Sequence, residues 1–250
     1  MMTVVGVLVG PRAWQWWDSR RTFAPETPLA QQCDHVPDGA RRAVLRAEDG
    51  TALGAALVGD PASPLAVVLR QGASQTLCDW LPWASETAAA TGAQVLLFDR
   101  RGRGSSPAAA GLAHEAEDLA GAVAGLRADG VEEVVLVASS MGNSVMFSAL
   151  ALLTEPPCAI AAISPVLVSR DGSGTVDGSD PGPLPPTWVT WETRNDVVSG
   201  NAATLVARAG LPSPVHPLPV DTEDHSRQLV ANHPRAAEFV LEAVLSCADR

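Results

Sequence analysis

The chain has 250 residues, of which 46% are hydrophobic and 18% are charged. This composition is typical of a globular protein, and the length suits one α/β domain with a buried core without requiring a second domain. The formal net charge of −11 at pH 7 argues against a nucleic-acid-binding protein, whose usual mark is a basic patch.

We place a single domain at residues 41–250 and treat residues 1–40 as an N-terminal segment. The apolar run at residues 3–10 is much shorter than the roughly 20 residues that span a bilayer, and it lacks the features of a signal peptide. Two interpretations stay open. The segment is a first strand or tail, or it is the end of a membrane anchor with Trp14, Trp16 and Trp17 at the interface. Membrane association is expected only through this segment, and the compartment stays open.

Strand and helix patterns alternate along the rest of the chain. A hairpin is expected from strands 42–46 and 52–58, which flank the turn Glu48-Asp49-Gly50. The patterns then predict strand 65–69, helix 80–91, strand 94–98, helix 112–128, strand 134–137, helix 141–153 and strand 159–163. A stretch rich in Gly, Ser, Asp and Pro at residues 169–186 predicts a mobile loop rather than a folded insertion. After it come strand 188–191, helix 202–209, strand 215–218 and helix 234–247.

This alternation predicts the fold class. Near-continuous apolar strands separated by helices indicate a mostly parallel central sheet with helices on both faces. The leading hairpin adds antiparallel strands at the N-terminal side, so the sheet is expected to be mixed.

The four cysteines, Cys33, Cys78, Cys158 and Cys247, have no spacing suited to a zinc site, and no metal is expected. If the domain is outside the cytoplasm, Cys33 and Cys78 are the expected bridging pair. Cys158 lies in an apolar strand pattern and Cys247 lies near a terminus.

The strand at 134–137 ends in the sequence Ala-Ser-Ser-Met-Gly at 138–142, just before a helical pattern. This arrangement is typical of a nucleophile elbow, where the residues two before and two after the nucleophile approach neighbouring backbone and must be small. Ala138 and Gly142 meet this condition for Ser140, whereas Ser139 has larger residues at both positions. The alternative is a simple helix N-cap followed by a loose turn.

From about residue 42 to its end, the chain resembles the α/β-hydrolase family. The elbow, Gln71-Gly72-Ala73 after a strand, the segment Asp-Arg-Arg-Gly-Arg-Gly-Ser-Ser-Pro at 99–107, and an acid followed by a histidine downstream carry the resemblance. It implies an α/β-hydrolase fold and a Ser-acid-His triad in that chain order. Two positions depart from the common pattern, Ala138 in place of Gly and Gln71 in place of His.

The resemblance also indicates the other triad members. Asp196, after the strand that follows the long loop, best matches the acid, with Glu192 at the strand end as the alternative. His225 follows the last strand and is the expected base, because a serine hydroxyl is a weak nucleophile until a base removes its proton. The remaining histidines fit the role of base less well. His35 and His114 precede the serine, His216 lies within a strand, and His233 precedes the last helix.

Further site residues are implied by the same resemblance. The backbone N–H groups of Met141 and Ala73 are expected to form an oxyanion hole. Trp80 and Trp83 are candidates to line the substrate pocket, with packing under a helix as the alternative. The segment at 99–106 is expected to brace loops near the site, because it lacks the Walker and G-x-G-x-x-G patterns of phosphate-binding loops.

We therefore expect a serine hydrolase of the esterase type that cleaves a small-molecule acyl substrate through an acyl-enzyme, with no cofactor. The short loop at 169–186 leaves no room for a helical cap and predicts an open site. One alternative is an acyltransferase or peptidase on the same triad. Another is a non-catalytic α/β-hydrolase scaffold used for binding, since a fold does not define a function.

Overall fold

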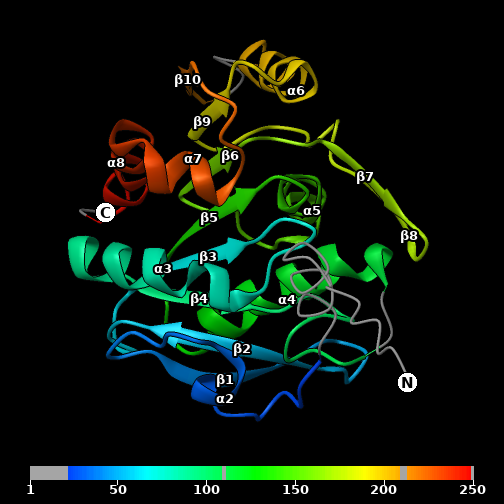
Figure 1. The fold of residues 1–250 in the computed structure, drawn as a ribbon, viewed down its shortest axis with the longest axis vertical. Helices are drawn as coiled ribbons and strands as arrows, with labels where there is room; N and C mark the ends of the chain where they lie inside the picture. Colours follow the sequence, from blue (N-terminus) through cyan, green and yellow to red (C-terminus); the bar gives the residue numbers. More distant parts are fainter. Residues whose placement is uncertain (1–21, 109–110, 209–212, 249–250) are drawn as a thin grey trace, which may run out of the picture.

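One large mixed β-sheet runs through the molecule (Figure 1). The computed structural model describes residues 22–108, 111–208 and 213–248. The sheet contains β1 (Arg41–Arg46), β2 (Ala52–Val58), β3 (Leu65–Arg70), β4 (Gln94–Phe98), β5 (Glu133–Ser139), β6 (Ala159–Ile163), β9 (Thr187–Glu192) and β10 (Val215–Val220). Their order is β1-β2-β4-β3-β5-β6-β9-β10. Only the β1–β2 and β2–β4 pairings are antiparallel, so the predicted mixed sheet is confirmed.

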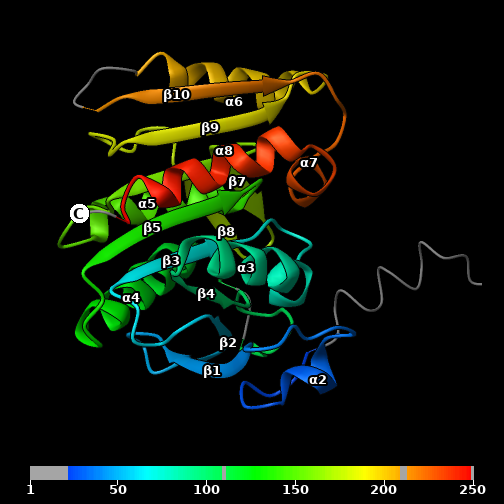
Figure 2. The same ribbon diagram turned by 90° about the vertical axis from the view of Figure 1, so that its left-hand side faces the viewer.

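Helices cover both faces of this sheet (Figure 2). They are α2 (Leu29–Gln32), α3 (Leu77–Thr91), α4 (Glu115–Ala128), α5 (Gly142–Ala149), α6 (Asp196–Val206), α7 (Arg227–Asn232) and α8 (Pro234–Leu245), with 3₁₀ turns η1 (Leu112–His114) and η2 (Leu150–Leu152). Buried residues of α3 and α8 belong to one hydrophobic core, and those of α4, α5 and α6 belong to a second core on the opposite face.

The central strands are apolar at nearly every position because they serve both cores. In β3, Val67 and Leu69 face the α3 and α8 side, whereas Ala66 and Val68 face the α4 and α5 side. Side chains of a strand alternate between faces, so a strand covered on both sides has no position left for a solvated residue. The uninterrupted apolar runs seen in the sequence follow from this arrangement.

The stretch between β6 and β9 differs from the prediction of a mobile loop. It forms a β-hairpin of β7 (Val168–Asp171) and β8 (Gly174–Asp177). The carboxylate of Asp171 accepts hydrogen bonds from the N–H and hydroxyl of Ser173 and shapes the turn. Val176 is buried, and the hydroxyl of Ser169 lies 2.8 Å from that of Ser144 in α5. The loop prediction is therefore wrong for residues 169–177, where Gly and Ser residues supply a turn and these contacts fix the hairpin to α5. Residues 178–186 belong to no helix or strand.

Residues 22–40 pack against the domain although the sequence placed them in a separate segment. A disulfide between Cys33 and Cys78 joins the end of α2 to the first turn of α3. The side-chain amide of Gln32 donates to Asp99 at 2.7 Å. The predicted Cys33–Cys78 pairing is therefore confirmed.

A second disulfide joins Cys158, just before β6, to Cys247, after α8. The sequence did not indicate this pair, because the two cysteines are 89 residues apart and meet only once α8 packs on the sheet. The apolar run at 3–10 and the tryptophans at 14, 16 and 17 lie outside the described residues. In the part of the chain that the structure describes, every helix is too short or too polar to cross a bilayer.

Asp99 at the end of β4 connects several loops, as expected for the segment that it begins. Its buried carboxylate accepts hydrogen bonds from the backbone N–H of Leu77 and of Ser105, both at 2.7 Å. Burial raises the pKa of Asp99, although these hydrogen bonds oppose the shift. Two residues on, Arg101 forms a bidentate pair with Asp118 of α4 at 2.8 and 2.7 Å. The start of α3 and the start of α4 are thereby held near the carboxyl end of β4.

The Cys33–Cys78 cross-link is expected to stabilise the fold. Removing it in the double variant Cys33→Ala/Cys78→Ala should lower the free energy of unfolding by about 2–4 kcal/mol, because a cross-link restricts the unfolded chain. Urea unfolding without reductant measures the change. The double variant Cys158→Ala/Cys247→Ala, which opens a longer loop, should lose at least as much. An unchanged unfolding midpoint in the first double variant would contradict the expectation.

Candidate active site

Ser140 lies at the sharp turn between β5 and α5, where the sequence places it. Its φ of 53° is in the left-handed region that favours glycine. Its N–H donates to the carbonyl of Ile163 at 3.0 Å, and its own carbonyl accepts from the side-chain amide of Asn143 at 3.0 Å. These hydrogen bonds hold a strained backbone that presents the Ser140 side chain at the carboxyl edge of the sheet.

The two small residues that flank Ser140 lie in closely packed positions. A Cβ atom on Gly142 would lie 2.1 Å from the carbonyl oxygen of Arg70 at the end of β3. Such a distance is impossible without a backbone shift. Ala138 is completely buried between the neighbouring strands β3 and β6. The turn at Ser140 therefore requires a residue without a side chain at position 142.

Ser140, His225 and Glu192 form a continuous hydrogen-bonded chain. The Ser140 hydroxyl lies 2.8 Å from Nε2 of His225, and Nδ1 of His225 lies 2.6 Å from Oε1 of Glu192. His225 lies in the loop between β10 and α7, as the sequence predicts. Its side chain is 37% exposed, whereas that of Glu192 is 0% exposed. The chain thus runs from an accessible hydroxyl to a buried carboxylate.

Asp196, the predicted acid, is not the carboxylate that contacts His225. Asp196 is exposed and occupies the first turn of α6, whose N-cap is Asn195. A carboxylate in the first turn of a helix interacts favourably with the helix dipole. Glu192, the alternative, is the last residue of β9 and bonds to His225. A glutamate is one methylene longer than an aspartate, so it reaches the imidazole from the strand end itself.

The buried carboxylate of Glu192 has hydrogen-bond partners for both oxygens. Oε2 accepts from the hydroxyl of Ser164 at 2.6 Å, and Oε1 also accepts from the side-chain amide of Asn195 at 3.2 Å. A buried carboxylate is costly unless it is paired or hydrogen-bonded. Ser164 follows β6 and is not among the site residues predicted from the sequence. Its only signal was a polar residue directly after an apolar strand.

The N–H groups of Met141 and Ala73 lie near Ser140 without a partner among the described residues. Neither Met141 nor Ala73 donates a backbone hydrogen bond to any described residue. The loop that carries Ala73 lies beside the serine, because a Cβ on Gly72 would be 3.2 Å from Cβ of Ser140. The N–H of Gly72 itself is occupied by the side chain of Gln75 at 3.0 Å. The two predicted donors, Met141 and Ala73, therefore have N–H groups that can bind a substrate oxygen.

Trp80 and Trp83 pack in the hydrophobic core. Trp80 has no exposed surface, so the prediction that it lines a substrate pocket is wrong. Trp83 is 8% exposed and meets Trp80 edge-on, with 5.7 Å between ring centroids. Both side chains point to the sheet because they lie on the buried face of α3, which is the alternative that the sequence left open.

A cluster of buried charges lies beside Met141. Glu115 pairs with Arg70, and one of its oxygens lies 3.5 Å from Arg100. The guanidinium of Arg100 also lies 3.4 Å from the sulfur of Met141. These ion pairs link the ends of β3 and β4 to α4 and support the residue after Ser140.

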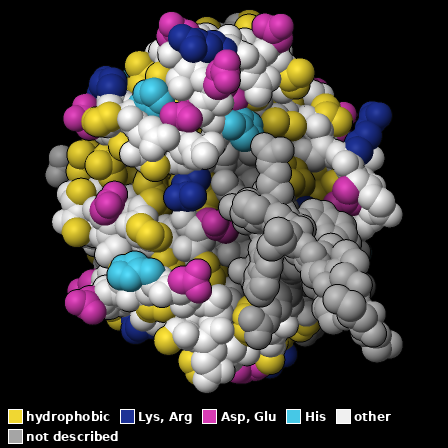
Figure 3. Space-filling view, in the orientation of Figure 1, with side chains coloured by type: hydrophobic (Ala, Val, Ile, Leu, Met, Phe, Trp, Pro, Cys, Tyr) yellow, Lys and Arg dark blue, Asp and Glu magenta, His cyan; other side chains and the backbone are white. Residues whose placement is uncertain are grey.

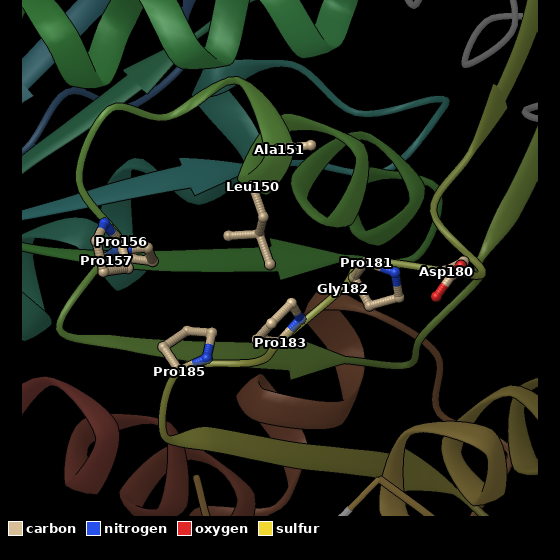
Figure 4. Close-up of a pocket in the computed structure, with 9 residues that line it drawn as sticks. All are labelled: Leu150, Ala151, Pro156, Pro157, Asp180, Pro181, Gly182, Pro183 and Pro185. Atoms are coloured by element: carbon tan, nitrogen blue, oxygen red, sulfur yellow. The ribbon is translucent and has the colours of Figure 1, made fainter. Parts of the chain in front are cut away.

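A proline-rich cavity of about 310 Å³ lies elsewhere in the molecule (Figure 4). Its lining consists of Leu150, Ala151, Pro156, Pro157, Asp180, Pro181, Gly182, Pro183 and Pro185. Several of these residues precede β6 and β9, so the cavity lies at the amino ends of these strands. Ser140 lies at the carboxyl end of β5, the edge where open α/β sheets bind their ligands. The cavity is therefore separate from the Ser140 site.

Acidic and basic side chains are mixed on the face of the molecule shown in Figure 3. Asp and Glu side chains are scattered among Arg side chains there, and apolar side chains lie between them. Within the described ranges, no three His, Cys, Asp or Glu side chains form a group that could hold a metal ion.

No family model and no curated protein sequence matches the chain. Solved structures do match it. An esterase from Pyrococcus furiosus has a TM-score of 0.65 at 16% identity, with 82% of this chain and 91% of that chain covered. An esterase/lipase from an uncultured bacterium has 0.60 at 16% identity, with 94% and 97% covered. An α/β serine hydrolase without a lid from Xanthomonas campestris has 0.59 at 18% identity, with 82% and 95% covered. At such identities the similarity shows a shared fold.

The close packing at Gly142 gives a stability prediction. Gly142→Ala should lower the free energy of unfolding by about 2–3 kcal/mol, because the neighbouring carbonyl of Arg70 is backbone and cannot move aside cheaply. Gly121→Ala is the matched control in α4, where an added methyl meets nothing, and it should stabilise the protein by about 0.5–1 kcal/mol. Urea unfolding compares the two. Equal effects would show that Gly142 is not a packing requirement.

Proposed function

The chain has the α/β-hydrolase fold, and we propose that on this fold it acts as a serine hydrolase that cleaves carboxylic esters or related acyl substrates. The observation that carries the proposal is the hydrogen-bonded chain from Ser140 through His225 to Glu192. We assign these residues as nucleophile, general base and orienting acid of a catalytic triad. The acid is Glu192 instead of the aspartate first expected.

In the proposed reaction, Ser140 Oγ attacks the acyl carbonyl while Nε2 of His225 takes the hydroxyl proton across the 2.8 Å contact. Glu192 holds the imidazole with Nε2 toward the serine and stabilises the imidazolium that forms. Collapse of the tetrahedral intermediate breaks the bond to the leaving alkoxide. The alkoxide takes the proton from His225 and departs as the alcohol, which leaves an acyl-enzyme on Ser140.

Water then completes the cycle. His225 removes a proton from a water molecule as its oxygen attacks the acyl carbon. The second tetrahedral intermediate releases Ser140 Oγ, which regains the proton from His225, and the carboxylic acid leaves. All groups that move protons in this scheme belong to the protein or to water.

The amides of Met141 and Ala73 are proposed to bind the oxygen that becomes negative during both attacks. Two observations support this role. Both N–H groups lack a partner among the described residues, and the Gly72 backbone lies against Ser140. Donors that are already aligned need no reorganisation as charge develops, and each is worth about 10²–10³ in kcat.

A non-catalytic scaffold is the alternative from another class. Burying the carboxyl group of Glu192 completely costs desolvation free energy, although both of its oxygens have hydrogen-bond partners, and a binding surface does not require this cost. The strained backbone of Ser140 is a similar cost. Both observations favour catalysis. Transfer to an acceptor other than water, or peptide cleavage, would use the same triad, and an acceptor assay distinguishes them.

Stoichiometric labelling by a fluorophosphonate probe, measured by intact mass, should occur in the parent and be abolished in Ser140→Ala and His225→Ala. In Glu192→Gln, an amide N–H facing Nδ1 would favour the wrong imidazole tautomer, so kcat for an ester should fall by about 10³–10⁴-fold.

Asp196→Asn is the matched control, because Asp196 is exposed and lies outside the hydrogen-bonded chain. It should keep the parental kcat. Loss of activity in Asp196→Asn with retention in Glu192→Gln would reverse the assignment of the acid. A folded parent that takes no label would favour the non-catalytic scaffold.

We also propose that the site takes small acyl groups or acyl groups exposed on a larger substrate. Between β6 and β9 the chain forms only the β7–β8 hairpin, with no helical cap in this fully described stretch. The side chain of His225 is 37% exposed, so the described residues leave the triad accessible. A long acyl chain would then stay largely in water.

The substrate prediction follows from this openness. Burial of one methylene contributes about 0.8 kcal/mol, or about fourfold in kcat/KM. We expect kcat/KM for p-nitrophenyl octanoate to exceed that for p-nitrophenyl butyrate by no more than about threefold, because the added methylenes find no apolar cover. A steady rise of about fourfold per methylene would instead require a buried acyl channel.

A further inference from the structure

Three residues other than glycine have a positive φ in the described ranges, and all three are serines at the candidate site. They are Ser140 at 53°, Ser164 at 47° and Ser226 at 62°. Ser140 is the proposed nucleophile, Ser164 bonds to Glu192, and Ser226 directly follows His225. Such conformations persist only where surrounding contacts hold them, and they concentrate at functional sites.

Ser226 is held by contacts to two other loops and to the end of β5. Its backbone N–H donates to the hydroxyl of Ser164 at 2.8 Å. Its hydroxyl is hydrogen-bonded to that of Ser139 at the end of β5, and it accepts from the side-chain amide of Gln75 at 3.0 Å. The side chain of Ser226 is buried, so these contacts are not replaced by water.

Gln75 lies in the loop that carries the proposed oxyanion donor Ala73. Its Oε1 accepts from the N–H of Gly72 and from the indole N–H of Trp80, both at 3.0 Å. Both partners can only donate, so Oε1 must face them. Nε2 then donates to the Ser226 hydroxyl at 3.0 Å, and this hydroxyl also lies 3.3 Å from Oε1. The orientation of the Gln75 amide is therefore determined by its partners.

We infer that Gln75 and Ser226 form a hydrogen-bonded bridge that positions the oxyanion loop relative to the histidine loop. The inference rests on the proposed function. On one side the bridge fixes Gly72, next to the donor Ala73. On the other side it fixes Ser226, next to the base His225. Both are positioning residues, because neither needs to touch the substrate.

The bridge matters because the two groups that it connects act on the same atoms. The serine attacks the acyl carbon while its proton moves to His225 and the carbonyl oxygen moves toward the amides of Met141 and Ala73. A displacement of about 1 Å between such groups can cost about 10²-fold in rate. Gln75 and Ser226 are 151 residues apart, so their contact fixes two loops that the chain itself does not connect closely.

The test is a double-mutant cycle on a small ester such as p-nitrophenyl butyrate. Gln75→Met keeps the length of the side chain and removes its hydrogen bonds, and Ser226→Ala removes the hydroxyl. Each should lower kcat by about 10–100-fold and change KM by less than about threefold, since the bridge aligns reacting groups rather than binding substrate. The kcat of the double variant should lie within about threefold of the kcat of the slower single variant, because both changes break the same bridge.

A second variant separates the hydroxyl from the backbone strain. Ser226→Gly removes the hydroxyl and also relieves the positive φ, so it should lose kcat as Ser226→Ala does. Ser246→Ala, which removes a hydroxyl bonded to the carbonyl of Ala243 at the end of α8, should keep parental kinetics. Thermal unfolding confirms that each variant is folded at the assay temperature.

Affinity for phenylboronic acid, which forms a tetrahedral adduct on the serine, should fall in Gln75→Met and Ser226→Ala in step with kcat. Parental kcat in Gln75→Met and Ser226→Ala, multiplicative losses in the double variant, or parental activity in Ser226→Gly would each overturn the inference while the triad stands. A parent that neither takes the fluorophosphonate label nor hydrolyses esters would remove the proposed function, and the bridge would fall with it.

Discussion

The close approach of Gly142 to the backbone of Arg70 is the constraint on which the site depends. It allows β5 to turn directly into α5 beside the end of β3. A Cβ atom on Gly142 would lie only 2.1 Å from the carbonyl oxygen of Arg70. This approach brings the Ser140 turn against the loop that follows β3. Parallel neighbours then bring Ser164 after β6 and Glu192 at the end of β9 to the same edge. A larger residue at position 142 would move Ser140 away from Ser164 and Glu192.

Polar contacts between loops complete what the sheet begins. Glu192 is buried, and its carboxylate accepts hydrogen bonds from Ser164 and Asn195 besides its contact with His225. Ser164 also accepts a hydrogen bond from the N–H of Ser226, which connects Glu192 to the loop of His225. Short hydroxyl side chains suit these positions, because they bond to backbone and carboxylate atoms within a crowded turn. The polar interior of the site is therefore one connected network.

Much of the architecture could be predicted because its signals are local. Apolar runs mark strands covered on both faces, and the small residues around Ser140 mark a turn that must approach backbone closely. The order of serine, acid and histidine limits the candidates for the base, and His225 lies where the sequence places it. The β7–β8 hairpin escaped prediction, because its Gly-rich composition does not reveal that Val176 and Ser169 are buried against α5.

By itself the sequence determined the mixed sheet, the turn at Ser140 and the loop that carries His225, since each follows from residues close together in the chain. Only the tertiary structure shows that Glu192 and not Asp196 contacts His225, because this depends on which carboxylate the folded strand end brings within 2.6 Å of the imidazole. The Cys158–Cys247 pair and the burial of Trp80 were likewise decided by packing. Contacts between distant segments depend on how helices and loops pack on the sheet, and a local pattern carries no record of that packing.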